Sequence, residues 1–185
     1  MNTARIMIPL HEYEQFDLVD VHLCVRFKQT MITGISYEKA EGIDFLSKQI
    51  ALLRDVIEQQ FAKKIIAQVD SYFHQANFQF TIACNIYQGT VFQQRVWQAL
   101  RKIPSGVVKT YGELAKELNT SARAIGNACR NNHFPFVIPC HRIVSASGVG
   151  GYAGDTLALQ KGKINFMKIK QSLLAHEACF KNKAE

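Results

Sequence analysis

The chain has 185 residues, of which 48% are hydrophobic and 20% charged, a composition typical of a folded globular protein with one or two small domains. No apolar run is long enough to cross a membrane, and the N-terminus lacks the features of a secretory signal, so we expect an intracellular protein. The five cysteines are odd in number and include no Cys-x-x-Cys pair, which argues against a disulfide framework and against a structural zinc site.

Charge is divided unevenly along the chain. Residues 1–88 hold 8 Lys and Arg and 10 Asp and Glu, a net charge of −2, whereas residues 89–185 hold 14 and 5, a net charge of +9. A basic half favours a polyanionic partner, because Lys and Arg neutralise phosphates and release counterions. A basic domain can equally have a solvated surface, so charge alone does not decide the partner. The two stretches are predicted to be separate domains.

The first half begins with signals of a sheet. Residues 19–27 alternate between apolar and polar side chains, the period of a half-buried strand, and residues 30–37 predict a second strand after a turn. We expect His22 and Cys24 to share the less buried face of the first strand. Together with His11 and Cys84 they could be imagined as metal ligands, but the four residues include no closely spaced ligand pair, so no metal is expected.

The rest of the first half reads as helix followed by strand. Residues 42–74 carry apolar side chains at helical spacing, and because this span is long for one globular helix, a break is expected at residues 59–64. Residues 78–83 alternate again and predict a return to the sheet. The first half is therefore expected to be a small α/β domain without chemistry of its own.

The second half is predicted to be mainly helical. Thr90 is a candidate N-cap for a helix over residues 91–100. Residues 111–118 and 121–129 predict two further helices, with Ser121 as the cap of the second. Their short connection gives the spacing of a helix-turn-helix.

Residues 138–144 form an apolar run with a thiol, an imidazole and a guanidinium in its middle. Pro139 favours extended geometry before it, so Cys140 is expected at a corner, at the end of a strand-like segment. The thiolate is the reactive form of cysteine, and His141 and Arg142 offer a proton acceptor and a positive charge that would lower the pKa of the thiol. An isolated cysteine in such a run is more often a buried structural residue, so its neighbours decide between the two interpretations.

The spaced motifs of the second half resemble the active-site signature of the O6-alkylguanine-DNA alkyltransferases, DNA-repair proteins that accept the alkyl group themselves. The resemblance covers nearly all of residues 89–185 and is thin before Gly89. It implies a ribonuclease H-like α/β N-terminal domain with a small antiparallel sheet, and a mainly α C-terminal domain with a winged-helix-like helix-turn-helix. The motifs are Thr110-Tyr111-Gly112-Glu113, Arg123-Ala124-Ile125-Gly126, Arg130-Asn131-Asn132, Pro135, Pro139-Cys140-His141-Arg142, Gly151-Tyr152 and Leu173-Leu174-Ala175-His176-Glu177.

The resemblance also implies roles for single residues in the chemistry. Cys140 would accept the alkyl group, His141 would act on the thiol through a bound water, and Glu177 would orient the imidazole. Asn132 would hydrogen-bond the backbone near the active-site turn, and His176 is expected to be structural.

A second set of implied roles concerns the DNA, whose damaged nucleotide must be flipped out of the stack before a thiol can reach it. Arg123 would enter the base stack, and Tyr111 would contact the extruded nucleotide and support protonation of guanine at N3. On pattern alone, Arg123 could be a surface charge and Tyr111 a core aromatic. Further DNA contacts are expected from Ala122, Ala124, Gly126 and Arg130, and a substrate pocket from Cys129, Pro135, Ile143, Tyr152 and Ala153.

The implied partner is duplex DNA carrying O6-alkylguanine. The resemblance also implies a monomer that needs no cofactor and that is cytoplasmic if the source is bacterial. The range of alkyl groups and activity on O4-alkylthymine stay open. One alternative is a cysteine hydrolase or acyl transferase using Cys140, His141 and Glu177, for which no feature marks an oxyanion hole. Another is a DNA-binding relative that only flags lesions, a class that lacks the reactive cysteine.

A Lys-rich stretch over residues 156–172 is longer than in the resembled family and is expected to form a surface loop. Its lysines, Lys161, Lys163, Lys168 and Lys170, could contact phosphates, although a solvated loop is the commoner interpretation.

Overall fold

The computed structural model describes residues 3–10, 13, 21–39, 46–75, 77–152 and 164–181, with the backbone alone for residues 46–48, 180 and 181. The chain divides into two compact units, Met1–Asn85 and Ile86–Glu185. None of the described helices is long and apolar enough to cross a membrane.

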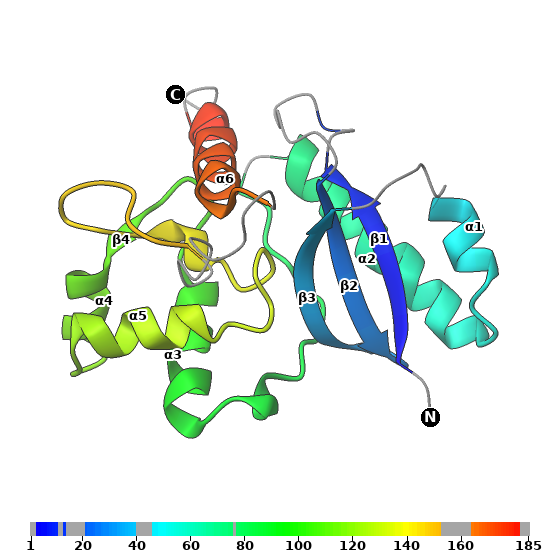
Figure 1. Ribbon diagram of the computed structural model, residues 1–185, viewed down its shortest axis with the longest axis horizontal. Coiled ribbons are helices and arrows are strands. Elements are labelled where there is room, and N and C mark those ends of the chain that lie inside the picture. Colours follow the sequence, from blue (N-terminus) through cyan, green and yellow to red (C-terminus); the bar gives the residue numbers. More distant parts are fainter. Residues whose placement is uncertain are drawn as a thin grey trace. The chain divides into compact units, whose positions relative to one another are not determined.

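The first unit is built on an antiparallel sheet of three strands (Figure 1). In spatial order these are β1 (Ala4–Pro9), β2 (Val21–Lys28) and β3 (Met31–Lys39). The described parts of the two predicted strands are confirmed, whereas β1 was not predicted. Gln29 in the tight turn between β2 and β3 has a φ of 53°, so this turn uses a left-handed backbone conformation.

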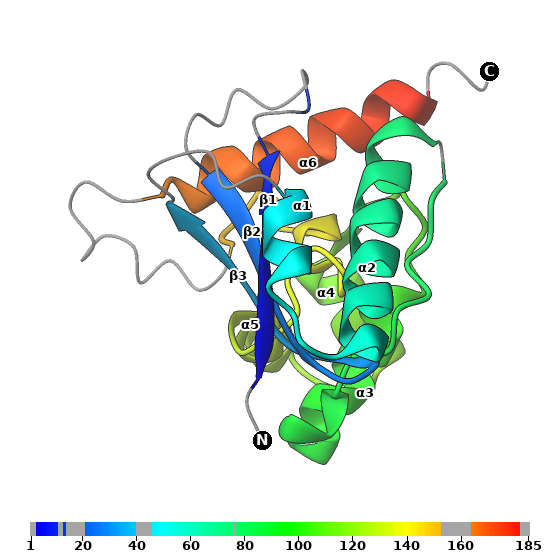
Figure 2. The same cartoon turned by 90° about the vertical axis from the view of Figure 1, so that its right-hand side faces the viewer.

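One face of the sheet is apolar and forms the core of the unit. The strand register places Ile6, Val25 and Ile35 beside one another on this face, and all three are buried. Helix α2 (Val56–His74) covers the face (Figure 2), with Phe61 packing edge to face against Phe27 at a ring-centroid distance of 5.5 Å.

The long helical stretch is divided earlier than predicted. Helix α1 spans Leu46–Ala51 and α2 begins at Val56, so the break falls before residue 56 and not at residues 59–64. Asp55 gives the physical reason, because its carboxylate accepts a hydrogen bond of 2.7 Å from the Ile57 N–H and caps a new helix there.

Residues 78–83 do not form the predicted strand. The contact with β3 is an isolated bridge between Cys84 and Ile32, in which the Ile32 N–H donates to the Ala83 carbonyl over 2.9 Å. The Thr81 N–H donates instead to the side chain of Gln68 in α2, over 3.0 Å. A side chain of the covering helix therefore takes the place of a neighbouring strand.

The polar face of β2 is more buried than the alternation suggests. His22 and Cys24 are only 7% and 1% exposed, although the face they share is the less buried one, as predicted, because Arg26 on it is half-buried and Lys28 exposed. Burial raises the pKa of the Cys24 thiol, and its hydrogen bond to Glu38 acts in the same direction. No three His, Cys, Asp or Glu side chains gather into a metal-binding group within the described ranges, outside which His11 lies.

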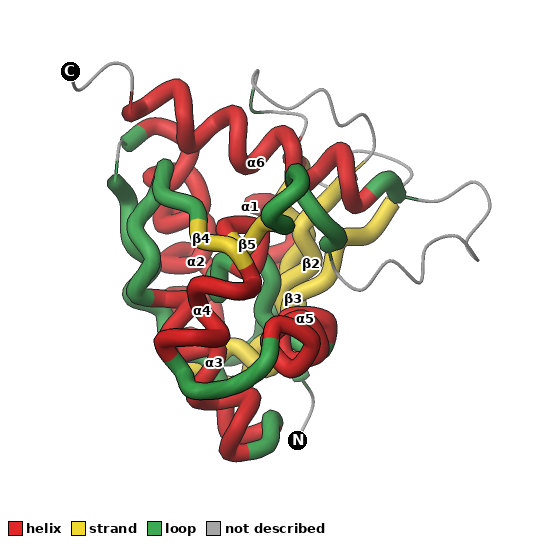
Figure 3. Tube along the Cα trace, turned by 90° about the vertical axis from the view of Figure 1, so that its left-hand side faces the viewer, coloured by secondary structure: helices red, strands yellow, loops and turns green. Residues whose placement is uncertain are grey.

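The second unit is mainly helical, as predicted (Figures 1 and 3). Its helices are α3 (Val91–Arg101), α4 (Tyr111–Glu117), α5 (Ala122–Arg130) and α6 (Phe166–Lys181), with 3-10 turns η2 (Ile86–Gln88) and η3 (Cys140–Arg142). The predicted caps are confirmed: Thr90 forms a capping box with Gln93, and the Ser121 hydroxyl accepts from the Ala124 N–H over 3.2 Å.

Helices α3 and α5 are tied together by a buried indole. Trp97 of α3 is 0% exposed, and its Nε1 donates to the Ala128 carbonyl of α5 over 2.9 Å. Its ring also meets the rings of His133 and Phe134 edge to face, at centroid distances of 6.0 and 6.1 Å. The indole therefore links α3, α5 and the segment that follows α5.

A short parallel strand pair connects the start of α4 with the segment after η3 (Figure 3). Strand β4 (Lys109–Thr110) pairs with β5 (Ile143–Val144), so that Lys109 lies opposite Ile143. Tyr111 follows β4 directly, and β5 follows Cys140–Arg142 directly. The pair thereby positions Tyr111 near the segment that carries the thiol.

The Lys-rich stretch is not a loop throughout. Helix α6 begins at Phe166, inside the stretch, and Lys170 is 0% exposed, which rules it out as a surface contact for phosphates. Lys168 is exposed on the same helix, and Lys161 and Lys163 lie outside the described residues.

Candidate active site

Cys140 lies at a corner, as predicted, although the segment before it is not strand-like. Residues 134–138 turn back on themselves through a hydrogen bond of 2.8 Å from the Ile138 N–H to the Phe134 carbonyl, and Cys140 opens the 3-10 turn η3. The extended segment, β5, follows the thiol instead of preceding it. Cys140 is 4% exposed.

Asn132 holds this corner with three hydrogen bonds. Its Nδ2 donates to the Ile138 carbonyl over 2.9 Å and to Sγ of Cys140 over 3.3 Å, while its Oδ1 accepts from the Phe134 N–H over 2.9 Å. One amide thus fixes both the backbone of the turn and the position of the thiol.

Burial is the main influence on the pKa of the Cys140 thiol. Burial raises the pKa of Cys140, and the Asn132 hydrogen bond and the positive charge of Lys170 offset only part of this effect. The expectation that Arg142 provides the charge that lowers this pKa was wrong. The backbone of η3 directs the guanidinium to Glu177 instead.

His141 and Glu177 form a fully buried pair, with Nε2 of the imidazole 2.9 Å from Oε1 of the carboxylate. An ionised carboxylate only accepts hydrogen bonds, so Nε2 carries the proton and Nδ1 of the neutral ring keeps a lone pair. Nδ1 is buried and has no hydrogen-bond partner among the described residues. Burial lowers the pKa of His141, whereas the Glu177 charge acts to raise it.

Glu177 also accepts hydrogen bonds from Arg142 and from the backbone. Arg142 donates from Nε to Oε2 over 3.0 Å and from Nη2 to Oε1 over 2.8 Å, and the Gly106 N–H donates to Oε2 over 3.1 Å. Burial acts to raise the pKa of Glu177, but His141 and Arg142 outweigh it and hold this pKa far below its usual range. The carboxylate is therefore ionised and fixed in orientation.

Lys170 is a site residue that sequence reasoning assigned to a surface loop. Its Nζ donates to the Ile143 carbonyl over 2.7 Å and to the Gly151 carbonyl over 2.9 Å. Tyr111 donates its hydroxyl hydrogen to the same Gly151 carbonyl over 3.3 Å. The ammonium thus ties α6 to the segments on both sides of residues 145–150. The i, i+7 spacing of Lys170 and Glu177 on a helix was the available signal for a shared site.

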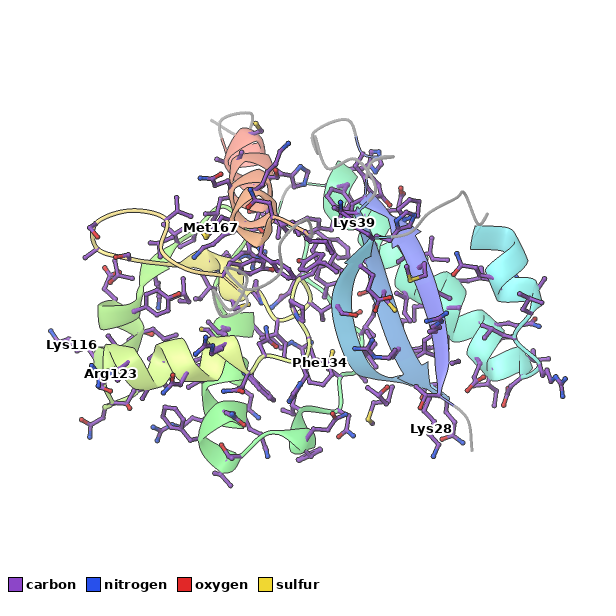
Figure 4. All side chains as sticks on the ribbon, viewed as in Figure 1. Lys28, Lys39, Lys116, Arg123, Phe134 and Met167 are labelled. Carbon is purple, nitrogen blue, oxygen red and sulfur yellow. The ribbon has the colours of Figure 1, made fainter. Side chains whose placement is uncertain are left out.

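Helix α5 has one face that packs against the rest of the unit and one face that is exposed. Ile125, Ala128 and Cys129 are buried, whereas Ala122, Arg123 and Arg130 are exposed, and Ala124 and Gly126 are half-buried. Figure 4 shows the side chains of Arg123 and Lys116 projecting outward from α5 and α4. The exposed face therefore combines small side chains with cationic ones.

A cleft of about 600 Å³ lies between the starts of α4 and α5 and the segment after β5. It contains Tyr111, Ala122 and Gly126 from the predicted DNA-contacting set. The full lining is Thr110, Tyr111, Gly112, Ala122, Gly126, Ser145, Ala146 and Gly151. The cleft has the aromatic ring of Tyr111 in its wall.

The described residues that were predicted to form the substrate pocket do not line this cleft. Cys129, Pro135, Ile143 and Tyr152 are buried, and Ala153 lies outside the described residues. Burial raises the pKa of the Cys129 thiol strongly, and the nearby Cys140 acts in the same direction. His176 is buried, next to Glu177 on α6.

Comparison of the sequence with known proteins identifies relatives of this chain. Residues 91–179 match the family model described as 6-O-methylguanine DNA methyltransferase, DNA binding domain. A methylated-DNA-protein-cysteine methyltransferase of Thermococcus barophilus is 32% identical over 157 residues, which cover 79% of this chain and 88% of that protein. One from Mycobacterium leprae is 44% identical over 92 residues, covering 48% of this chain and 55% of that protein.

Two solved structures extend the similarity to the fold. The O6-methylguanine-DNA methyltransferase of Pyrococcus kodakaraensis superposes with a TM-score of 0.63 and 26% identity, covering 95% of this chain and 99% of that one. An OGT of Mycobacterium tuberculosis in complex with DNA superposes with a TM-score of 0.61 and 28% identity, covering 86% of this chain and 88% of that one.

Proposed function

Because this chain belongs to the methylated-DNA-protein-cysteine methyltransferases, a family that repairs DNA by alkyl transfer, we propose that its acceptor atom is Sγ of Cys140 and its substrate O6-alkylguanine in duplex DNA. The observation that carries the proposal is the corner itself. It places a thiol 3.3 Å from an amide donor and directly before a buried imidazole that is paired with a carboxylate.

DNA is engaged by the exposed face of α5. Small side chains at Ala122, Ala124 and Gly126 let the helix approach a groove closely, while Arg123 and Arg130 supply positive charge. The alkylated nucleotide leaves the stack, at a cost of a few kcal/mol, and Arg123 fills the space that it vacates. The cleft beside Tyr111 and Gly126 receives the extruded nucleotide.

The base is then held for the reaction. The Tyr111 hydroxyl contacts the nucleotide and supports protonation of guanine at N3, while the carbonyls of Cys140 and Ile143 accept from its exocyclic amine. The Ile143 carbonyl already accepts from Lys170, which fixes its direction and leaves a second lone pair. Cys129, Pro135 and Tyr152, which are buried, form the apolar surroundings.

The transfer moves one alkyl group and one proton. Nδ1 of His141 takes the thiol proton through a bridging water, and Glu177 stabilises the imidazolium that results. Sγ bonds to the alkyl carbon as the bond from that carbon to O6 breaks. The electron pair passes to the guanine, which takes a proton at N3 from the Tyr111 hydroxyl. The thiol proton held by His141 returns through solvent to the tyrosine oxygen, and the repaired guanine stays in the DNA strand. No step requires a cofactor.

The test is the stoichiometry of repair. A thioether has no good leaving group, so excess O6-methylguanine duplex should give a plateau of one repaired base per active protein, with Cys140 heavier by one methyl group and C140A inactive. A cysteine hydrolase would exceed the plateau, and a lesion-flagging protein would repair nothing. A methyl group found on Cys24, Cys84, Cys129 or Cys179 would contradict the assignment of Cys140.

The remaining features of the proposal concern the whole chain. We propose a ribonuclease H-like domain over residues 1–88 and a winged-helix-like domain over residues 89–185, acting as a cytoplasmic monomer. The small antiparallel sheet with helices and the mainly helical second unit support this division. Limited proteolysis should release fragments that separate near residue 89, and light scattering should give the mass of one chain.

A further inference from the structure

Arg142 is a buried charge that the proposed alkyl transfer does not use. Its side chain is 8% exposed, and the guanidinium donates to Glu177 from Nε and Nη2 and to the Ile103 carbonyl from Nη1. Burying a guanidinium costs free energy unless its hydrogen-bond partners are well placed. We therefore ask what the buried charge of Arg142 does in the site.

The guanidinium shares its acceptor with the imidazole. Oε1 of Glu177 accepts from Nη2 of Arg142 over 2.8 Å and from Nε2 of His141 over 2.9 Å. A carboxylate that is already neutralised by a fixed positive charge attracts a second proton to the imidazole less strongly. Arg142 therefore opposes the very effect by which Glu177 favours imidazolium.

The charged groups that act on His141 come from two elements. Helix α6 contributes Glu177 and Lys170, and η3 contributes Arg142. Burial is the largest influence that lowers the pKa of His141, and both Arg142 and Lys170 lower it further. Lys170 also acts on the thiol of Cys140. Arg142 acts both on the imidazole and on the carboxyl of Glu177, whose pKa it lowers.

We propose that Arg142 limits transfer of the Cys140 thiol proton to His141 in the resting protein, both by neutralising Glu177 and by placing its own positive charge beside the imidazole. This inference rests on the proposed roles of Cys140 and His141 and makes Arg142 a positioning residue of that site. A protein that uses its nucleophile once gains from latency, because a resting thiolate is lost to any electrophile or oxidant.

The test is the pH profile of iodoacetamide labelling of Cys140 in the full chain without DNA, followed by peptide mass spectrometry. R142M removes the charge, R142Q removes the charge but keeps a hydrogen-bond donor, and R142K keeps the charge. The first two should move the profile to lower pH, and labelling at neutral pH should become about tenfold faster if the thiol pKa falls by about 1. R142K should label at close to the unmodified rate.

Glu177 provides the opposing control, because the two halves of this ion pair act on His141 in opposite directions. E177Q should move the profile to higher pH, and the double variant R142M/E177Q should label faster than E177Q alone. Each single variant leaves one buried charge without its partner, whereas the double variant removes both charges together. The double variant should therefore stay folded even if a single variant does not. Equal labelling of E177Q and the double variant, or a movement of the R142Q profile to higher pH, would overturn the proposal.

These outcomes are separate from those of the repair assay. Iodoacetamide needs neither DNA nor a flipped base, so the labelling profile reports the resting thiol alone. Failure of the one-to-one stoichiometry would contradict the function of Cys140 and leave the labelling order unchanged. A wrong labelling order with intact stoichiometry would contradict the role of Arg142 only.

Discussion

The amide of Asn132 donates to Sγ of Cys140 over 3.3 Å, and the same Nδ2 donates to the Ile138 carbonyl over 2.9 Å. The proposed acceptor atom and the backbone that presents it therefore depend on one side chain. Neutral hydrogen bonds of this kind contribute about 1 kcal/mol each, and leaving a buried partner unsatisfied costs more.

Replacing Asn132 by Ala should lower the free energy of unfolding by about 1–3 kcal/mol, because several partners lose their hydrogen bonds. It should also raise the pKa of the Cys140 thiol, since the donor that favours the thiolate is removed. Urea denaturation and the labelling profile measure the two effects. N132D is the matched control: it keeps an acceptor for the Phe134 N–H but loses the donor, and an unchanged thiol pKa in N132D would contradict the assignment.

Lys170→Met should destabilise the second unit by about 2 kcal/mol or more, because two carbonyls lose a charged donor and stay buried. K168M alters an exposed lysine on the same helix and should change the free energy of unfolding by less than about 0.5 kcal/mol. Thermal and urea unfolding of the two variants compare these effects. Equal small changes would mean that the buried ammonium contributes nothing measurable.

Arg123→Ala should slow repair of O6-methylguanine in duplex DNA by about tenfold or more, because the variant lacks the side chain that fills the vacated stack. Its reaction with the free modified base should be nearly unchanged, since no flipping is required. K116A removes another exposed charge from the neighbouring helix and serves as the control. Equal losses on duplex and free base would assign Arg123 to the chemistry instead.

Affinity for undamaged duplex should fall linearly with salt concentration on logarithmic axes and depend little on sequence, because phosphate contacts release counterions. Arg130→Ala should reduce the slope by about 1 if its side chain neutralises one phosphate. Electrophoretic mobility shifts at several salt concentrations measure the slope. An affinity independent of salt would contradict binding through the basic half.

Stability should depend on pH through Glu177. Burial acts to raise the pKa of this carboxyl, but His141 and Arg142 lower it well below the unfolded value of about 4.3. A carboxyl with a lowered pKa stabilises the fold above its unfolded pKa, and that contribution is lost as pH falls through the folded pKa. The free energy of unfolding should therefore drop more steeply below pH 5 in the unmodified protein than in E177Q. Parallel curves would exclude Glu177 as the source.

Local signals were enough to predict α3, α4 and α5 of the second unit, but not α6. Thr90 and Ser121 satisfy the first N–H groups of α3 and α5, and such capping depends only on residues three positions apart. Strand β1 was missed because a strand is defined by its partner, and that partner, β2, follows a long connection. Residues 78–83 were wrongly predicted to be a strand for the same reason. Alternation of apolar and polar residues does not show whether a partner strand is available.

The site shows the same division between local and distant determinants. The candidate nucleophile and its neighbours could be picked out in residues 138–144, but the direction of Arg142 depends on Glu177, which lies 35 residues further along the chain. Lys170 is one of several lysines in its stretch, and only its contacts with the Ile143 and Gly151 carbonyls distinguish it. Composition predicts solvated lysines there, and tertiary packing overrides that expectation.

The indole that joins α3 to α5 has a practical consequence, because Trp97 is the chain's single tryptophan. Its intrinsic fluorescence comes from one site, and the emission depends on the hydrogen bond to the Ala128 carbonyl and on the neighbouring rings of His133 and Phe134. Ala128 belongs to the helix proposed to meet DNA, and Phe134 belongs to the turn that Asn132 fastens to the thiol. Movement of either element should change the wavelength or intensity of the light emitted by this residue, so the protein carries its own optical reporter and needs no attached dye.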